Sequence, residues 1–248
     1  MRVIIKLEDE KKQAIDNAYN KLQGFVYSLI REKFNSIHDK KGYKFFCFSN
    51  IFPFEGSRIR NFIISSPSKE LINSIAEKLE IGKIVNIGET QFKIKEYSIF
   101  EVKISKRNVH ICSSTPIIIR IPEARYNSYN IPQEERKKRY VYWRPKYSFE
   151  AFLKQLSENL IKKFNDFYGT EIYRYDLFEQ FIFKKSVYSN LTINGKDYPF
   201  AGSLWEFMWS YMDSVQRKII EFGIDAGFGE RNSMGFGFVN PRYSLGSQ

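Results

Sequence analysis

The sequence predicts an α+β fold, because segments with the two-residue period of a strand alternate with segments that have the period of a helix. In the first half, the apolar residues follow the order strand, helix, strand, strand, helix, strand. The second half repeats that order, and 248 residues suffice for two domains of ordinary size. The predicted architecture is therefore two tandem βαββαβ domains, the ferredoxin-like or RRM-like arrangement.

The first domain is assigned to residues 1–106. It begins with a strand in which Val3, Ile5 and Leu7 alternate with polar residues. A helix is expected over residues 15–34, since its apolar side chains recur at helical spacing. Further expected elements are strands at 45–48 and 59–64, a helix that begins at Ser66-Pro67 and stops before Gly82, and extended structure at 92–102.

The second domain is assigned to residues 107–248. Its expected elements are short strands at 109–112 and 117–119, an irregular basic segment at 122–146, a helix at 153–167 ended by Gly169, strands at 172–183 and 198–209, a helix that begins at Asp213, and a last strand at 236–239. Asn194-Gly195 predicts a tight hairpin between the two longer strands.

Composition indicates an anionic partner. The chain has 39 Lys and Arg against 28 Asp and Glu, a formal net charge of +11, and 17% aromatic residues. This mixture is expected where phosphates are neutralised and bases are stacked. A solvated basic surface with no nucleic-acid partner is the alternative that charge alone leaves open.

Several protein classes are disfavoured. The amino terminus has no signal-peptide core, and no apolar run approaches a membrane span, so a cytoplasmic protein is expected. Cys47 and Cys112 are interpreted as small buried hydrophobes. Together with His38 and His110 they show no zinc-type spacing, and we expect no metal and no cofactor.

A cluster of glycines at 227–237 stands between the last helix and the last strand. The dinucleotide fingerprint and the P-loop have the opposite order, strand then glycines then helix, which argues against a nucleotide cradle. Glycine allows a backbone to turn with positive φ or to approach a ligand closely. Two interpretations stay open here, a ligand-contacting loop and a turn that only joins helix to strand.

Two further groups of residues suggest RNA chemistry. Arg139, Arg144 and Lys146 lie in the basic segment among Tyr140, Tyr142, Trp143 and Tyr147, where aromatic faces can stack on unpaired bases. Tyr27, His38 and Lys44 supply a base, an acid and a cation for metal-free cleavage beside a ribose 2′-hydroxyl. The alternatives are a mobile surface loop for the first group, and a half-buried tyrosine with a solvated histidine for the second.

These residues resemble the Cas6 family of CRISPR-associated endoribonucleases, within the repeat-associated RNA-binding superfamily. The closest match is the loop, where Gly227-Phe-Gly229, five residues including Arg231, and Gly235-Phe-Gly237 fit the family's glycine signature. The segment Leu22-Gln-Gly-Phe-Val-Tyr27 is also similar. His38 and Lys44 follow at the spacing of members that use a Tyr-His-Lys set.

The resemblance implies metal-independent cleavage of CRISPR repeat RNA, with 2′,3′-cyclic phosphate and 5′-hydroxyl products. Tyr27 would be the general base, His38 the general acid and Lys44 the transition-state cation, although the first two roles are exchangeable. The loop residues expected to bind RNA are Gly227, Gly229, Arg231, Asn232, Gly235 and Gly237. The alternative is a non-catalytic subunit that binds repeat RNA within an effector complex. A monomer and a homodimer are both compatible with the sequence.

Overall fold

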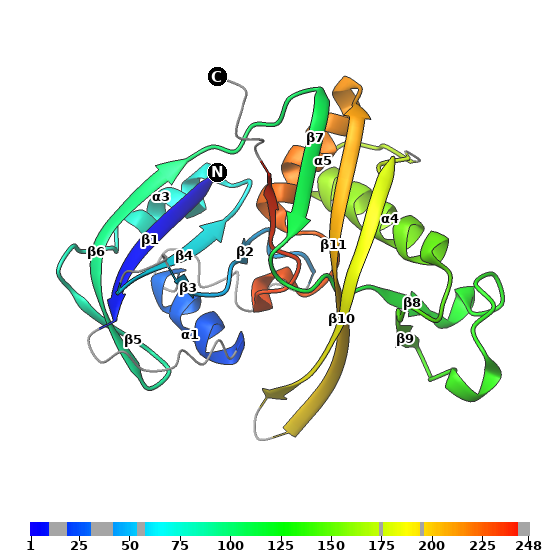
Figure 1. Ribbon diagram of the computed structural model, residues 1–248, viewed down its shortest axis with the longest axis horizontal. Coiled ribbons are helices and arrows are strands. Elements are labelled where there is room, and N and C mark those ends of the chain that lie inside the picture. Colours follow the sequence, from blue (N-terminus) through cyan, green and yellow to red (C-terminus); the bar gives the residue numbers. More distant parts are fainter. Residues whose placement is uncertain (10–18, 31–41, 54–57, 174–175, 194–195, 243–248) are drawn as a thin grey trace. The chain divides into compact units, whose positions relative to one another are not determined.

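The computed structural model describes residues 1–9, 19–30, 42–53, 58–173, 176–193 and 196–242 (Figure 1). Two compact units divide the chain between Val102 and Lys103, a few residues before the predicted domain boundary. The glycine loop contributes to both units, since Asp225–Gly227 and Asn232–Gly235 belong to unit 1 and Phe228–Arg231 belongs to unit 2.

Unit 1 is built on an antiparallel sheet with the order β2-β4-β1-β6-β5, and β3 also pairs with β4. Its strands are β1 (Arg2–Asp9), β2 (Cys47–Phe48), β3 (Phe52–Pro53), β4 (Ile59–Ser65), β5 (Ile84–Ile87) and β6 (Thr90–Phe100). Helix α1 (Tyr19–Ile30) lies between β1 and β2, and α3 (Lys69–Ala76) lies between β4 and β5. The path β2-β4-β1-β6 has the strand order of a ferredoxin-like domain, as predicted.

The core of unit 1 follows from the two periodicities. Val3, Ile5 and Leu7 share one face of β1 and are fully buried. They form one cluster with the buried residues of α1 and α3. The start of α3 differs from the prediction because Ser68, not Ser66, caps the helix, with its Oγ accepting a hydrogen bond from the backbone N–H of Leu71 at 3.2 Å.

Unit 2 contains a four-stranded sheet with the order β10-β11-β7-β12. Its strands are β7 (Arg107–Ser113), β10 (Gln180–Ile193), β11 (Lys196–Tyr211) and β12 (Val239–Pro241), and its helices are α4 (Phe149–Tyr168) and α5 (Ser214–Ala226). The chain order β7, α4, β10, β11, α5, β12 is again βαββαβ. The predicted α+β fold with two ferredoxin-like domains is therefore confirmed.

Between β7 and α4 the chain forms a second, smaller sheet from β8 (Arg120–Pro122) and β9 (Tyr140–Tyr142). Short 3-10 helices at η1 (Glu123–Arg125) and η2 (Gln133–Glu135) lie between these two strands. This insertion is the basic segment that the sequence presents as irregular. Its strands escape sequence analysis because three residues are too few to show a period.

The β10–β11 hairpin extends beyond the part of β11 that pairs with β7 (Figure 1). Strand β7 pairs with β11 between residues 206 and 211, whereas β10 remains paired with β11 as far as Ile193 and Lys196. The predicted turn residues Asn194 and Gly195 are outside the described part of the chain. The sequence predicted that this strand would begin at Ile172, but β10 begins at Gln180.

Packing in unit 2 centres on aromatic residues. The rings of Phe152 on α4 and Trp205 on β11 stack at 4.2 Å between centroids. Helix α4 ends, as predicted, at Gly169, which has a left-handed φ of 66°. Within the described residues, no helix has both the length and the apolar sequence that crossing a bilayer requires.

Candidate catalytic pair and nucleic-acid interface

Two of the three predicted cleavage residues meet in unit 1. Tyr27 lies on α1 with its ring half-buried against the core, and Lys44 lies just before β2. Lys44 Nζ donates a hydrogen bond to Tyr27 Oη over 2.9 Å. The Tyr27 ring also meets the buried Phe46 edge to face, with 5.8 Å between centroids. The phenol oxygen is therefore held beside an ammonium group by the packing of its own ring.

This pair has the elements of an acid–base site. An ammonium that is hydrogen-bonded to a phenol oxygen stabilises negative charge that develops on that oxygen. The same ammonium has further N–H groups that can bind a phosphate oxygen. His38, the third predicted residue, is not among the described residues.

The glycine loop runs from α5 to β12, as predicted, and its backbone is largely enclosed. Gly229 has a φ of +70°, and a Cβ at this position would lie 2.6 Å from the carbonyl oxygen of Ile118. The buried Lys163 donates a hydrogen bond from Nζ to the Gly229 carbonyl oxygen at 3.1 Å. The backbone N–H of Glu230 donates a hydrogen bond to the carbonyl oxygen of Ile118 at 2.9 Å. Gly229 therefore shapes the loop against β8 and the residues before it.

The other predicted loop residues also have structural partners. Gly235 has a φ of +94°, and its missing Cβ leaves room for the ring of Phe48. The backbone N–H of Gly235 donates to the carbonyl of Asn232 at 2.9 Å. Gly227 packs on the Asn232 side chain. The backbone N–H of Gly237 donates a hydrogen bond to the carbonyl oxygen of Pro116 at 2.9 Å. These contacts favour the interpretation in which the glycines form a turn that joins helix to strand. Arg231 is the charged residue of the loop that lines a pocket.

Replacing Gly229 with alanine is expected to destabilise the protein by roughly 1–3 kcal/mol, because a positive φ is costly for alanine and the new methyl group would meet the Ile118 carbonyl. Chemical denaturation checks this. Gly24→Ala is the matched control, since nothing lies within 4 Å of a Cβ there. That helical substitution is expected to stabilise by roughly 0.5–1 kcal/mol. Equal effects of the two variants would contradict the structural role of Gly229.

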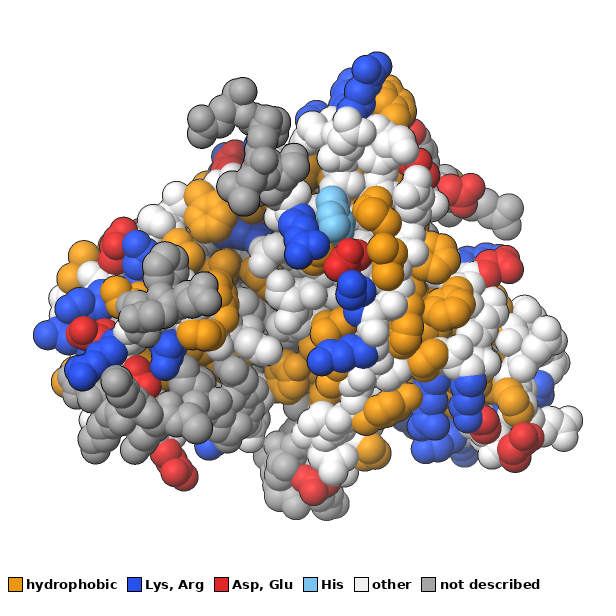
Figure 2. Space-filling view, in the orientation of Figure 1, with side chains coloured by type: hydrophobic (Ala, Val, Ile, Leu, Met, Phe, Trp, Pro, Cys, Tyr) orange, Lys and Arg blue, Asp and Glu red, His pale blue; other side chains and the backbone are white. Residues whose placement is uncertain are grey.

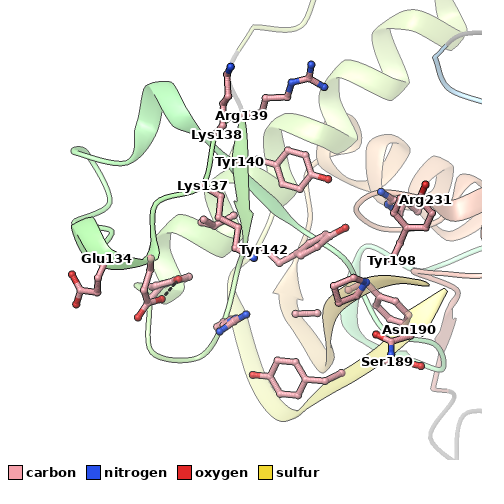
Figure 3. A pocket seen from close by; sticks show the side chains of 18 residues that line it. Glu134, Lys137, Lys138, Arg139, Tyr140, Tyr142, Ser189, Asn190, Tyr198 and Arg231 are labelled. Carbon is pink, nitrogen blue, oxygen red and sulfur yellow. Dashed lines mark hydrogen bonds between the residues drawn. The ribbon is translucent and has the colours of Figure 1, made fainter. Parts of the chain in front are cut away.

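Arg231 opens into a pocket of about 880 Å³ within unit 2 (Figure 3). The walls come from β9 and the residues before it, from the β10–β11 hairpin, and from the glycine loop. In Figure 3, the rings of Tyr140 and Tyr142 point from β9 toward Arg231, while Lys138 and Arg139 extend away from this group at the rim. The basic and tyrosine residues that line it are Lys137, Lys138, Arg139, Arg144, Arg231, Tyr140, Tyr142, Tyr147, Tyr188 and Tyr198.

The pocket is lined by five lysines and arginines against two carboxylates, Glu134 and Glu135, so its charge is net positive. Burial raises the pKa of Tyr140, but hydrogen bonding with Tyr142 and the charges of Arg120 and Arg231 outweigh burial, so its pKa lies below the ordinary value. Burial raises the pKa of Tyr142, against the opposing charge of Arg231. The guanidinium of Arg120 lies 4.7 Å from the Tyr140 ring centroid and forms an ion pair with Glu230. Such a field favours an anion, and a phosphate is the anion that matches several arginines.

The structure brings together three of the four predicted basic RNA-binding residues, since Arg139, Arg144 and Arg231 all line this pocket. Lys146 instead forms an ion pair with Glu135. The expectation that Trp143 presents a face for stacking was wrong. Trp143 is only 3% exposed, because its ring packs against Phe152 of α4 and Trp205 of β11 in the aromatic core of unit 2.

Sequence reasoning missed the contribution of the β10–β11 hairpin. Tyr188 and Tyr198 are 59% and 48% exposed, and both line the pocket. The guanidinium carbon of Arg144 lies 6.0 Å from the Tyr188 ring centroid. One feature of the sequence could have indicated this wall. Tyr188 and Tyr198 lie on either side of the predicted Asn-Gly turn, near the end of a long hairpin.

Lysine and arginine side chains gather at this end of unit 2. Figure 2 shows them clustered where Figure 1 places β8, β9 and the segment between them. Exposed tyrosines accompany the arginines in the pocket. Aromatic faces bind bases and cations bind phosphates, so this surface suits single-stranded nucleic acid.

The chain is similar to known proteins in sequence and in fold. The sequence profile described as "CRISPR associated protein Cas6, C-terminal" matches residues 95–241, more than half of the chain. The "CRISPR-associated endoribonuclease Cas6 2" of Methanocaldococcus jannaschii is 28% identical, over 97% of this chain and 99% of the relative. The "CRISPR-associated endoribonuclease Cas6" of Haloferax mediterranei is 29% identical, over 97% of this chain and 93% of the relative.

Solved structures share the fold. One described as "CRISPR associated protein Cas6" superposes with a TM-score of 0.68 at 23% identity, over 98% of this chain and 99% of the other. A Cas6 product complex gives a TM-score of 0.63 at 11% identity, over 97% and 99% of the two chains. With its carboxyl-terminal half matched by the family profile and both units matched in fold, the chain belongs to the Cas6 family of CRISPR-associated proteins.

Proposed function

We propose that this protein is an endoribonuclease that cleaves CRISPR precursor transcripts within the repeat and thereby releases guide RNAs. The observation that carries the proposal is the 2.9 Å hydrogen bond from Lys44 Nζ to Tyr27 Oη. It pairs a proton-transfer group with a cation in a family whose curated relatives are named endoribonucleases.

The proposed reaction uses the RNA's own 2′-hydroxyl as the nucleophile. Tyr27 removes the proton from this hydroxyl, whose oxygen attacks the adjacent phosphorus atom. Lys44 stabilises the negative charge on the phosphate oxygens and on the phenol oxygen. His38 protonates the leaving 5′-oxygen, which breaks the P–O bond. The products carry a 2′,3′-cyclic phosphate and a 5′-hydroxyl, and the assignments of Tyr27 and His38 can be exchanged.

In this proposal the unit 2 pocket holds part of the RNA. Tyr142, Tyr188 and Tyr198 offer rings on which unpaired bases stack, and the arginines around them bind phosphates. Arg231 belongs to this group, and its charge acts on both Tyr140 and Tyr142. The glycines position Arg231 rather than contact RNA themselves.

Incubation of the full chain with repeat RNA in EDTA tests the proposal. Cleavage at one position is expected, with no cleavage of scrambled RNA of equal length. Binding of repeat RNA without cleavage would favour a repeat-binding subunit instead. Equal affinity for repeat and scrambled RNA, with no cleavage, would contradict both.

Arg231→Ala is expected to weaken repeat-RNA binding by roughly 5- to 100-fold, because it removes a cation that makes charge-assisted hydrogen bonds to phosphate. The slope of the logarithm of affinity against the logarithm of salt concentration should also fall by about one unit. Fluorescence anisotropy at several salt concentrations measures both quantities. Arg107→Ala, on an exposed position of β7, is the matched control. An unchanged affinity for Arg231→Ala would leave the loop as a structural joint only.

A further inference from the structure

The sheet of unit 2 carries a second cluster of reactive side chains. His110 and Cys112 are two residues apart on β7 and therefore point to the same face of the sheet. Glu206 stands directly opposite Cys112 on β11 and joins them on that face. All three are half-buried, and their ligand atoms lie within 4.8 Å of one another. The sequence offers no hint of this group, because Glu206 is remote from the other two residues along the chain.

The two distances from His110 to the other ligand atoms match the edges of a metal tetrahedron. His110 Nε2 lies 3.2 Å from Glu206 Oε2 and 3.5 Å from Cys112 Sγ. Zinc ligands at about 2.0–2.3 Å from the ion, arranged tetrahedrally, are about 3.3–3.6 Å apart. Imidazole, thiolate and carboxylate are also the ligand types that zinc takes in proteins.

We propose that His110, Cys112 and Glu206 bind a zinc ion, with its fourth position open to water. The ligands are held in advance by the sheet. Strand β7 is paired on both sides, with β11 and with β12, and the His110 carbonyl accepts a hydrogen bond from the backbone N–H of Arg242 at 2.7 Å. A site on paired strands loses little freedom when it takes up the ion.

Two cations lie close to this site and limit its affinity. Lys184 Nζ contacts Glu206 Oε1 at 3.2 Å, whereas His110 Nε2 contacts the other carboxylate oxygen, Oε2. Lys184 therefore neutralises part of the carboxylate charge that would otherwise attract the ion. Its side chain is 50% exposed, so it can also turn toward solvent. Arg242 acts on Cys112 with positive charge. Removing the Lys184 ammonium should strengthen zinc binding.

The site is separate from the cleavage proposed above, since it shares no residue with Tyr27, His38 and Lys44. The test uses the full chain without an affinity tag, stripped of metal and titrated with Zn²⁺ against a chromophoric chelator. One bound ion per chain is expected. Cys112→Ser should weaken binding by roughly 100-fold or more, because a thiolate ligand is lost. Cys47→Ser, at the chain's other cysteine, should leave binding unchanged.

Two further measurements guard against a variant that fails to fold. Co²⁺ bound to the unmodified chain should show a thiolate-to-cobalt absorption band, and Cys112→Ser should lack it while retaining a folded circular dichroism spectrum. Lys184→Ala should bind Zn²⁺ severalfold more tightly, because an ammonium no longer competes for the carboxylate. Failure to bind one ion, binding in Cys112→Ser equal to the unmodified chain, a cobalt complex without the thiolate band, or weaker binding in Lys184→Ala would overturn the proposal.

Discussion

His38→Ala is expected to lower the rate constant of repeat-RNA cleavage by about 10²–10⁴-fold, because a positioned general acid or base contributes that much. Histidine suits this role, since its pKa lies near neutrality when it is unperturbed. RNA affinity should change little, because the proposed RNA-holding arginines and tyrosines belong to unit 2.

Single-turnover cleavage with enzyme in excess over RNA measures this rate constant without product release. Anisotropy on the same variant measures affinity separately. The pH–rate profile adds a second readout, because the variant should lose the limb that reports histidine. Cleavage by His38→Ala at the unmodified rate would remove this residue from the mechanism and require another proton donor.

Lys44→Ala and Tyr27→Phe are each expected to lower the cleavage rate constant by about 10²–10³-fold, since each removes a group that acts on charge in the transition state. Their hydrogen bond makes the effects interdependent. The double variant should therefore be much less impaired than the product of the two single effects predicts.

A double-mutant cycle on single-turnover rate constants measures this coupling. Tyr97→Phe is the matched control, because Tyr97 is another partly buried tyrosine packed against the same core. It should cleave at the unmodified rate. Strictly multiplicative effects of Lys44→Ala and Tyr27→Phe would show that the two side chains act separately.

The architecture was readable from the sequence because each half buries one face of a sheet and one stripe of each helix. Val3, Ile5 and Leu7 illustrate this, since alternation alone predicts their burial. Gly169 likewise predicts the end of α4. The start of α3 was misplaced because Ser66 and Ser68 can both cap a helix, and tertiary contacts decide between them. Ser66 instead donates to the carbonyl of Phe45.

Only part of the candidate site could be predicted from the sequence. The prediction that Tyr27 acts with Lys44 rests on a resemblance and on residue types, and their contact requires the fold to bring the segment before β2 beside α1. Arg231 was identified from the glycine signature, but the wall formed by Tyr188 and Tyr198 was not. Contacts of that kind depend on strand register and hairpin length, which one sequence does not specify. The same reason hid the proximity of Glu206 to His110.

The central claim is that side chains of this protein activate the RNA's own 2′-hydroxyl. The most direct measurement compares repeat RNA with the same RNA carrying a single 2′-deoxy nucleotide before the scissile phosphate, in EDTA. The account predicts 2′,3′-cyclic phosphate and 5′-hydroxyl ends from the first RNA and an intact second RNA. Cleavage of the deoxy-substituted RNA at the same position, or a requirement for added Mg²⁺, would contradict it.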